Sequence, residues 1–283
     1  MQELFMTNVI VTELSDFRAD HLEGALVLSR QAGWPHRLED WQMSLEVSDG
    51  VVALRDGEVV GTALATRFDD VAAINLIIVA QSLRGQGFGR RLMQDVLARA
   101  QGCEQRLCAT ADGLPLYENL GFTATGEVFQ HQGTAQAAEA HADALPAVRR
   151  GGAADFEAFV AADHAAFGAQ RRALLERIFA RGTLLCTEGG YACLRDFGRG
   201  TVLGPIVAES DEAAEALLIK AARICEGRFL RIDLPDTATA LRPRAQSLGL
   251  APAGGGIAMI RHPKPAAPAA SYRSYALASQ ALG

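Results

Sequence analysis

The chain has 283 residues, 49% of them hydrophobic, which is enough material for two domains of modest size. Its formal net charge of −6 argues against a nucleic-acid partner, and it contains no run of ~20 uninterrupted apolar residues that would cross a membrane. The five cysteines include no Cys-x-x-Cys pair and the first residues lack a signal-peptide pattern, so we expect a cytoplasmic protein with reduced thiols and no metal site.

Hydrophobic periodicity divides residues 9–130 into a first series of strands and helices. The predicted elements are a strand at 9–12, helices at 16–31 and 38–47, a hairpin of 50–54 and 59–66, a strand at 71–79, a helix at 88–101, a strand at 105–110, a short helix at Tyr117 and a strand at 122–130. Asp56-Gly57 marks the hairpin turn, and the strand at 71–79 is nearly all apolar, which is typical of the centre of a sheet.

Residues 132–147 are rich in Ala, Gln and Glu and predict a connector. A second series then repeats the first in the order of its elements: a strand at 147–149, helices at 155–167 and 171–181, a hairpin of 184–187 and 191–195, a strand at 201–207, a helix at 211–225, a strand at 229–234, a helix at 237–248 and a strand at 257–260. We therefore predict domains at 1–133 and 147–262, a linker at 134–146, and a tail at 263–283 that begins with a Pro/Ala-rich stretch and either packs back on the body or is disordered.

A glycine-rich turn follows the apolar strand at 71–79 and precedes an amphipathic helix. Gly85, Gly87 and Gly89 alternate there, which lets the backbone adopt positive φ and lie close to a ligand. The N–H groups of such a turn, together with the helix dipole, bind a phosphate without any side-chain charge. Arg90 stands where the dinucleotide fingerprint needs a third glycine, and Arg90-Arg91 is not the Lys-Ser/Thr of a Walker loop. These two nucleotide motifs are therefore excluded, and an ordinary tight turn is the alternative.

The pattern Arg84-x-x-Gly87-x-Gly89 resembles the pyrophosphate-binding signature of the GCN5-related N-acetyltransferase (GNAT) superfamily. The segment 114–122 is similar to the Leu-Tyr-x-x-x-Gly-Phe segment that the family carries on and after its fourth helix. The resemblance implies an α/β (α+β) fold of two GNAT-like domains, each with a mixed, mostly antiparallel central sheet and helices on both faces. It also implies acetyl-CoA, or another acyl-CoA, as co-substrate.

In the family, the strand before the turn pairs with the pantetheine arm of the cofactor, and the turn binds its diphosphate. The residues implied to bind the cofactor are Ile77, Ile78, Val79, Arg84, Gly85, Gln86, Gly87, Phe88, Gly89, Arg90 and Thr110. The backbone N–H of Val79 is the implied donor to the thioester carbonyl, and Tyr117 is the implied general acid for the CoA thiolate. Thr110 departs from the asparagine of many members, and a tyrosine that only packs beside the cofactor is the alternative for Tyr117.

Three residues are candidates for the acceptor pocket. Trp34 and His36 belong to the loop that usually contacts the acceptor in this fold, although core packing is an equal alternative for the tryptophan. Asn75 lies inside an otherwise apolar strand and needs a hydrogen-bond partner, so it is either structural or part of the pocket. The attacking amine must be neutral, but no residue stands out as the base that takes its proton.

The second series has no glycine turn, because residues 208–212 place Glu209, Asp211 and Glu212 where a pyrophosphate would lie. No tyrosine occupies the position that matches Tyr117 either. We therefore expect one working cofactor site, in the first domain. The leading function is an N-acyltransferase that moves an acetyl (acyl) group from acetyl-CoA to the primary amine of a small molecule by direct attack in a ternary complex. A protein or peptide N-acetyltransferase and a non-catalytic acyl-CoA-binding sensor are the alternatives.

Overall fold

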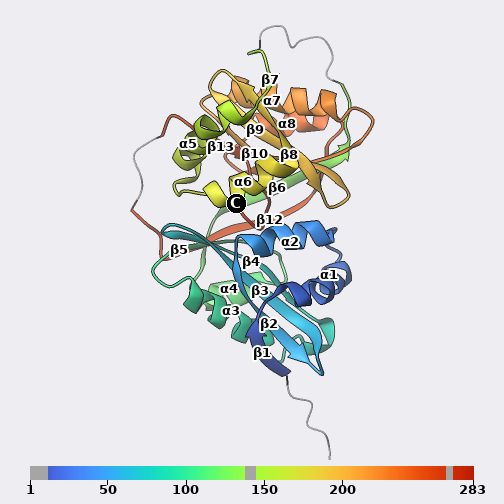
Figure 1. Ribbon diagram of the computed structural model, residues 1–283, viewed down its shortest axis with the longest axis vertical. Coiled ribbons are helices and arrows are strands. Elements are labelled where there is room, and N and C mark those ends of the chain that lie inside the picture. Colours follow the sequence, from blue (N-terminus) through green and yellow to red (C-terminus); the bar gives the residue numbers. More distant parts are fainter. Residues whose placement is uncertain (1–11, 138–144, 266–269) are drawn as a thin grey trace, which may run out of the picture.

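The computed structural model describes residues 12–137, 145–265 and 270–283, and its strands form one sheet with helices on both faces (Figure 1). The strands of the first half are β1 (Thr12–Asp16), β2 (Asp49–Arg55), β3 (Glu58–Phe68), β4 (Val71–Val79), β5 (Glu104–Ala109) and β6 (Thr123–Thr134). Those of the second half are β7 (Arg149–Arg150), β8 (Gly182–Thr187), β9 (Gly190–Phe197), β10 (Gly200–Ala208), β11 (Phe229–Pro235), β12 (Ala251–Arg261) and β13 (Arg273–Ala276).

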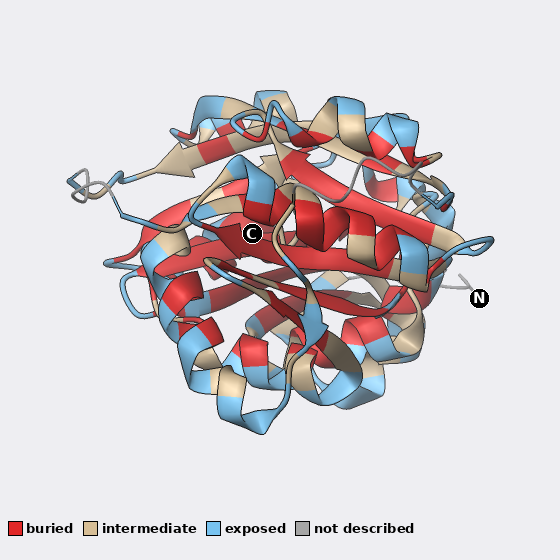
Figure 2. Ribbon diagram, turned by 90° about the horizontal axis from the view of Figure 1, so that it is seen from above, coloured by how far each residue is buried: buried red, intermediate tan, exposed pale blue. Residues whose placement is uncertain are grey.

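Helices cover both faces of this sheet, and Figure 2 shows the strands buried between them while the outer sides of the helices are exposed. The helices are α1 (Leu22–Gln31), α2 (Leu38–Glu46), α3 (Phe88–Arg99), α4 (Leu114–Asn119), α5 (Phe156–Phe167), α6 (Arg172–Arg181), α7 (Asp211–Ile224) and α8 (Leu241–Ser247). The mixed, mostly antiparallel sheet with helices on both faces is therefore as predicted.

The sheet order shows that each half of the chain gives one strand to the other half. The order is β1-β2-β3-β4-β5-β12-β6-β11-β10-β9-β8-β7, and β13 pairs with β10. Strand β12 pairs antiparallel with β5 of the first half, and β6 pairs antiparallel with β11 of the second half. Followed inward from either end, the sheet therefore contains the same arrangement twice, with β6 and β12 exchanged. The expected boundary at residue 133 falls inside β6, which pairs with β11 of the second half. The domain limits therefore stay a prediction.

In each half, two parallel strands separate after three residue pairs. Residues 71–73 of β4 pair with 104–106 of β5, but the remainder of β4, up to Val79, makes no pair with β5. Residues 201–203 of β10 pair with 230–232 of β11, and these two strands then separate as well. A gap consequently opens between the paired strands at the same place in both halves.

The tail of the chain fills the gap of the second half. Strand β13 pairs antiparallel with β10 at residues 206–208, and the N–H of Leu277 donates to the carbonyl of Asp233 on β11. A Cβ on Gly204 would collide with the carbonyl of Leu277, so only glycine lets the tail backbone approach so closely. Of the two predicted states of the tail, residues 270–283 thus show the packed one. The gap between β4 and β5 receives no such strand from the described residues.

Most predicted elements lie within a few residues of their expected positions, but four expectations need correction. Residues 9–11 of the predicted strand at 9–12 lie outside the described residues, whereas Asp16, the expected start of the helix at 16–31, is the last residue of β1, and α1 begins only at Leu22. Residues 132–134 belong to β6 and not to the connector, because they pair with β11. Helix α8 begins only at Leu241, since a helix cannot extend far ahead of Pro243. Strand β12 begins at Ala251, well before the predicted 257.

A buried ion pair fixes the end of the tail to the second half. The guanidinium of Arg171 donates to both carboxylate oxygens of Asp163, at 3.0 and 2.6 Å, and to the carbonyls of Leu282 and Gly283. Arg171 and Asp163 are 2% and 0% exposed, so neither charge has water as an alternative partner.

Arg171→Ala should therefore lower the free energy of unfolding by about 3–5 kcal/mol, because it leaves the Asp163 carboxylate buried and unpaired. Urea unfolding at neutral pH measures this loss. Arg172→Ala is the matched control, since Arg172 makes only exposed pairs, with Glu157 and Glu176, and should change stability by less than about 1 kcal/mol. Equal effects of the two variants would contradict the anchoring role of Arg171.

Candidate active site

A bulge in β4 shapes the edge of the gap between β4 and β5. Leu64 pairs with Asn75 and Thr62 pairs with Ile78, so two residues of β4 oppose one residue of β3 there, and Leu76 has φ +49°. The N–H of Ala80 donates to the carbonyl of Val60 on β3. Because backbone groups alternate along a strand, the N–H of Val79 points away from β3, to the side where β5 has separated.

The glycine turn presents free backbone donors at the start of α3. Gly87 is the N-cap residue, with φ +83° and no side-chain cap, and Gly85 has φ +76°. The first helical bond runs from the N–H of Arg91 to the carbonyl of Gly87. The N–H groups of Phe88, Gly89 and Arg90 therefore have no acceptor among the described residues. Three free amides at a helix N-terminus fit an anion such as a diphosphate.

Tyr117 lies on α4 and is 6% exposed. Its ring packs edge-on against Phe122, and a Cβ on Gly113 would lie 2.7 Å from it, so glycine allows this close contact. Burial raises the pKa of the phenol to about 12, which keeps the hydroxyl protonated at neutral pH. No hydrogen bond from the hydroxyl to another described residue is formed, so its proton is available to a ligand.

A cavity of about 430 Å³ brings Tyr117 together with residues from both halves of the chain. Of the predicted site residues it is lined by Trp34, His36, Asn75, Ile77, Thr110 and Tyr117. The second half and the tail add Phe197, Arg199, Arg231 and residues 279–282, none of which the sequence had indicated. Ile78, Val79 and Arg84 line a neighbouring hollow of about 1240 Å³ beside α1 and the β2–β3 turn. These predicted residues are thus divided between two adjoining spaces that share β4, whereas the predicted residues 85–90 line neither of them.

Comparison with known proteins agrees with this geometry. Residues 15–122 match the model of the acetyltransferase (GNAT) family, and residues 159–272 match that of an acetyltransferase (GNAT) domain. The chain is 31% identical over 291 residues to the uncharacterized N-acetyltransferase YitH of Bacillus subtilis, covering 97% of this chain and 99% of that one. The chain belongs to the GNAT acetyltransferase family.

Solved structures show that the tandem GNAT fold extends over the whole chain. A putative acetyltransferase from Pyrococcus horikoshii aligns over 96% of both chains with a TM-score of 0.82 and 20% identity. A tandem GNAT protein from the clavulanic acid biosynthesis pathway aligns over 91% of this chain and 100% of its own, with a TM-score of 0.62 and 15% identity. Among the described residues, no helix of this GNAT protein is long and apolar enough to span a bilayer, and no cluster of metal-binding side chains occurs.

In the second half, the gap between β10 and β11 differs in three respects from the gap between β4 and β5 in the first half. Strand β13 pairs along β10, where β4 in the first half is free of such a partner. The Ser210 side chain caps α7 by accepting from the N–H of Ala213, whereas α3 has no side-chain cap. Asp211, in the first turn of α7, binds Arg273 and the Tyr275 hydroxyl of the tail. The backbone and the helix start that would bind a cofactor are therefore engaged within the chain.

His36 is held as a neutral ring within the cavity wall. Its Nδ1 lies 2.9 Å from the hydroxyl of Ser29, which also accepts from the indole N–H of Trp41. The serine has one proton, and donating it to Nδ1 satisfies all three groups; the ring proton is then on Nε2. Burial lowers the pKa of His36 to about 4. His36 thus contributes an N–H donor and an aromatic edge, and it is poorly placed to act as a base.

The two ends of the Asn75 side-chain amide differ in their hydrogen bonding. Its amide nitrogen donates to the Thr66 hydroxyl and to the carbonyl of Ala73, at 2.9 and 3.1 Å. Its Oδ1 is buried and has no partner in the described part of the chain. The nitrogen thus fixes the side chain in the sheet, while the residue also lines the cavity; its part in an acceptor pocket stays a prediction.

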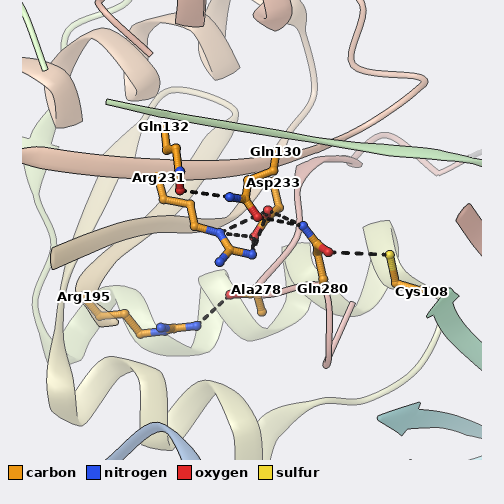
Figure 3. Close-up of polar contacts among 8 residues, drawn as sticks. All are labelled: Cys108, Gln130, Gln132, Arg195, Arg231, Asp233, Ala278 and Gln280. Carbon is orange, nitrogen blue, oxygen red and sulfur yellow. Dashed lines mark hydrogen bonds and ion pairs between the residues drawn. The ribbon is translucent and has the colours of Figure 1, made fainter. Parts of the chain in front are cut away.

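A polar network joins the two halves and the tail at the cavity wall (Figure 3). Arg231 binds both oxygens of Asp233, and Gln280 donates to Asp233 and Gln130. The thiol of Cys108 contacts Gln280 at 3.9 Å. Burial raises the pKa of this thiol to about 12, so Cys108 is not a nucleophile at neutral pH despite its position. The charged pair at 231 and 233 stands on one face of an otherwise apolar strand, which was the available sequence signal for these residues.

Proposed function

We propose that this acetyltransferase moves an acyl group from acetyl-CoA, or another acyl-CoA, to the primary amine of a small molecule that binds in the cavity at the junction of the two halves. The observation that carries the proposal is the combination of free amides at the start of α3, an open edge on β4 and a protonated tyrosine in the adjoining cavity. A sensor would need the first two features but has no use for the third.

Each group has a distinct role in this proposal. The free amides of Phe88, Gly89 and Arg90 bind the diphosphate within the turn at 84–90, and the edge of β4 from Ile77 to Val79 binds the pantetheine arm. The acyl-CoA supplies an activated thioester. The N–H of Val79 donates to the carbonyl oxygen, and the Tyr117 hydroxyl gives its proton to the departing sulfur. The amine binds next to Ile77 and Tyr117 in the cavity, and attacks directly because the thioester lies beside it at the edge of β4.

The walls of the cavity favour a small acceptor over a peptide. They come from the loop before α2, from β9 and β11 of the second half, and from the tail at 279–282. Helix α2 is also tied to the second half, because Glu46 pairs with Arg177 and Arg181 and the Asp40 carboxylate accepts from the N–H of Gly198. A peptide substrate would require an open groove across this junction.

Calorimetric titration with acetyl-CoA tests the cofactor part of the proposal. We expect one site per chain, because β13 and its contacts with Asp211 fill the corresponding place in the second half. Two sites would contradict the assignment of the second half as non-binding, and no binding would overturn the proposed function. Release of free CoA thiol on addition of primary amines then tests acyl transfer.

A further inference from the structure

Two arginines of the second half flank the same aromatic ring at the cavity. The guanidinium carbons of Arg195 and Arg231 lie 5.2 and 5.4 Å from the centroid of the Phe197 ring. Phe197 and Arg231 line the cavity, and Figure 3 shows both arginines reaching toward the tail segment that carries Ala278 and Gln280. Both residues are largely buried, at 3% exposure for Arg195 and 9% for Arg231.

The positive charge in and directly behind this wall exceeds the negative charge, because Arg231 lines the cavity and Arg195 is buried behind the lining. The carboxylate of Asp233 is neutralised by its ion pair with Arg231, through Nε and Nη2. Arg195 pairs with no carboxylate among the described residues; its Nη2 donates to the carbonyl of Ala278, while Nε and Nη1 are buried without a partner. Asp40, also at the cavity, is paired with Arg37. A buried cation without a carboxylate is costly, so the wall is prepared for an additional anion.

Arg231 offers the donor that such an anion would bind. Its Nε and Nη2 are occupied by Asp233, whereas its Nη1 forms no hydrogen bond among the described residues and belongs to a side chain that lines the cavity. Asp233 holds the guanidinium in place and is itself held by Gln280, so little side-chain entropy is lost when Nη1 binds. The diphosphate donors lie elsewhere, at the start of α3 in the first half.

Aromatic rings form one part of the remaining cavity lining, beside polar side chains such as Gln130 and Gln132. Trp34, Trp41 and Phe197 contribute rings, with His36 packed edge-on between them at ring-centroid distances of 5.7–6.1 Å. An acceptor that fills this space therefore needs an apolar body as well as an anionic group.

Resting on the proposed function, we propose that the acceptor is an amine that carries a carboxylate and an apolar side chain, an amino acid or a close analogue of one. The carboxylate binds Nη1 of Arg231 under the field of Arg195, and the apolar side chain packs among the rings. The amine then lies toward Ile77 and Tyr117. The same positive field favours the neutral form of the amine, which is the form that attacks.

Matched pairs of amines that differ only in the carboxylate test this proposal. L-phenylalanine is compared with 2-phenylethylamine, and L-leucine with 3-methylbutylamine, by CoA thiol release with acetyl-CoA as donor. We expect kcat/KM to be at least about 10-fold higher for the carboxylated member of a pair, the range of one charged hydrogen bond. Arg231→Gln should reduce this ratio to near unity, whereas Arg228→Gln, a change of an exposed arginine just before the same strand, should leave it intact.

The outcomes separate the two levels of the proposal. Equal use of both members by the wild-type protein would overturn the carboxylate assignment and leave acyl transfer standing. Failure of every amine, in a protein that binds acetyl-CoA, would overturn the acceptor class together with the small-amine function. Loss of acetyl-CoA binding would indicate that Arg231→Gln does not fold. Arg231→Lys then replaces it, because lysine keeps a cation beside Asp233. A kcat/KM ratio between the carboxylated and the plain amine still at the wild-type value in Arg231→Lys would contradict the role of Nη1.

Discussion

Gly87→Glu should abolish measurable binding of acetyl-CoA, and Gly89→Glu should do the same. Either change places a carboxylate among the free amides of Phe88, Gly89 and Arg90, where it competes with the diphosphate and repels it. The site also loses the left-handed backbone at Gly87, which has φ +83°. Calorimetric titration with acetyl-CoA measures the loss directly, and we expect the affinity to fall by at least about 100-fold, because two anions would then share one helix terminus.

The matched control is Gly102→Glu. Gly102 lies just beyond the other end of α3, has φ +82° and, like Gly87, has nothing within 4 Å of the position that a Cβ would take. It therefore introduces the same charge and the same backbone strain away from the turn. A Gly87→Glu protein that is folded and still binds acetyl-CoA as the control does would show that the cofactor binds elsewhere.

Local patterns made much of the first half predictable from the sequence. The nearly all-apolar run at 71–79 is β4 with the predicted bounds, and Asp56-Gly57 is the turn between β2 and β3. Both features depend on residues close in sequence, on the period of the side chains and on the φ preference of glycine. The order of the elements repeats for the same reason, which is why two similar halves were foreseen.

The exchange of β6 and β12 could not be predicted in this way. Both strands lie at the end of their half. The alternation of apolar and polar side chains predicts that a segment is a strand, but it does not indicate which half of the chain that strand pairs with. The glycine-rich start of β12 also obscured its length. In the structure Gly255 has φ +151° and a Cβ there would collide with the carbonyl of Val128, so the glycines permit a bulged strand that lies against β6.

The candidate site was predictable only where it depends on the first half. Trp34, His36, Asn75 and Tyr117 line one cavity, and their roles at an acceptor pocket and in catalysis stay predictions. Arg231 and Gln280 line the same cavity but lie more than a hundred residues further along the chain. They reach it because β11 pairs with β6 and because the tail packs between the two halves. The predicted cofactor residues stay a prediction until binding is measured.

Tyr117→Phe should lower kcat of acyl transfer by about 100-fold or more and leave the affinity for acetyl-CoA nearly unchanged. The phenol forms no hydrogen bond with a described residue, and the ring packs against Phe122 and Gly113 through carbon atoms, so phenylalanine fits the same space. Because burial raises the pKa of the phenol to about 12, the wild-type rate should show no loss from this group between pH 7 and 9.5. Steady-state kinetics and calorimetry together make the measurement.

Tyr191→Phe provides the same chemical change on β9, where the ring packs against Phe159 and Tyr272 away from the cavity, and it should leave kcat as in the wild type. An unchanged kcat in Tyr117→Phe would remove this phenol as the acid, and water that enters with the acceptor would have to protonate the thiolate instead. Loss of acetyl-CoA affinity without loss of kcat would identify Tyr117 as a residue that packs beside the cofactor. Only a selective loss of kcat, absent from the control, distinguishes proton donation from packing.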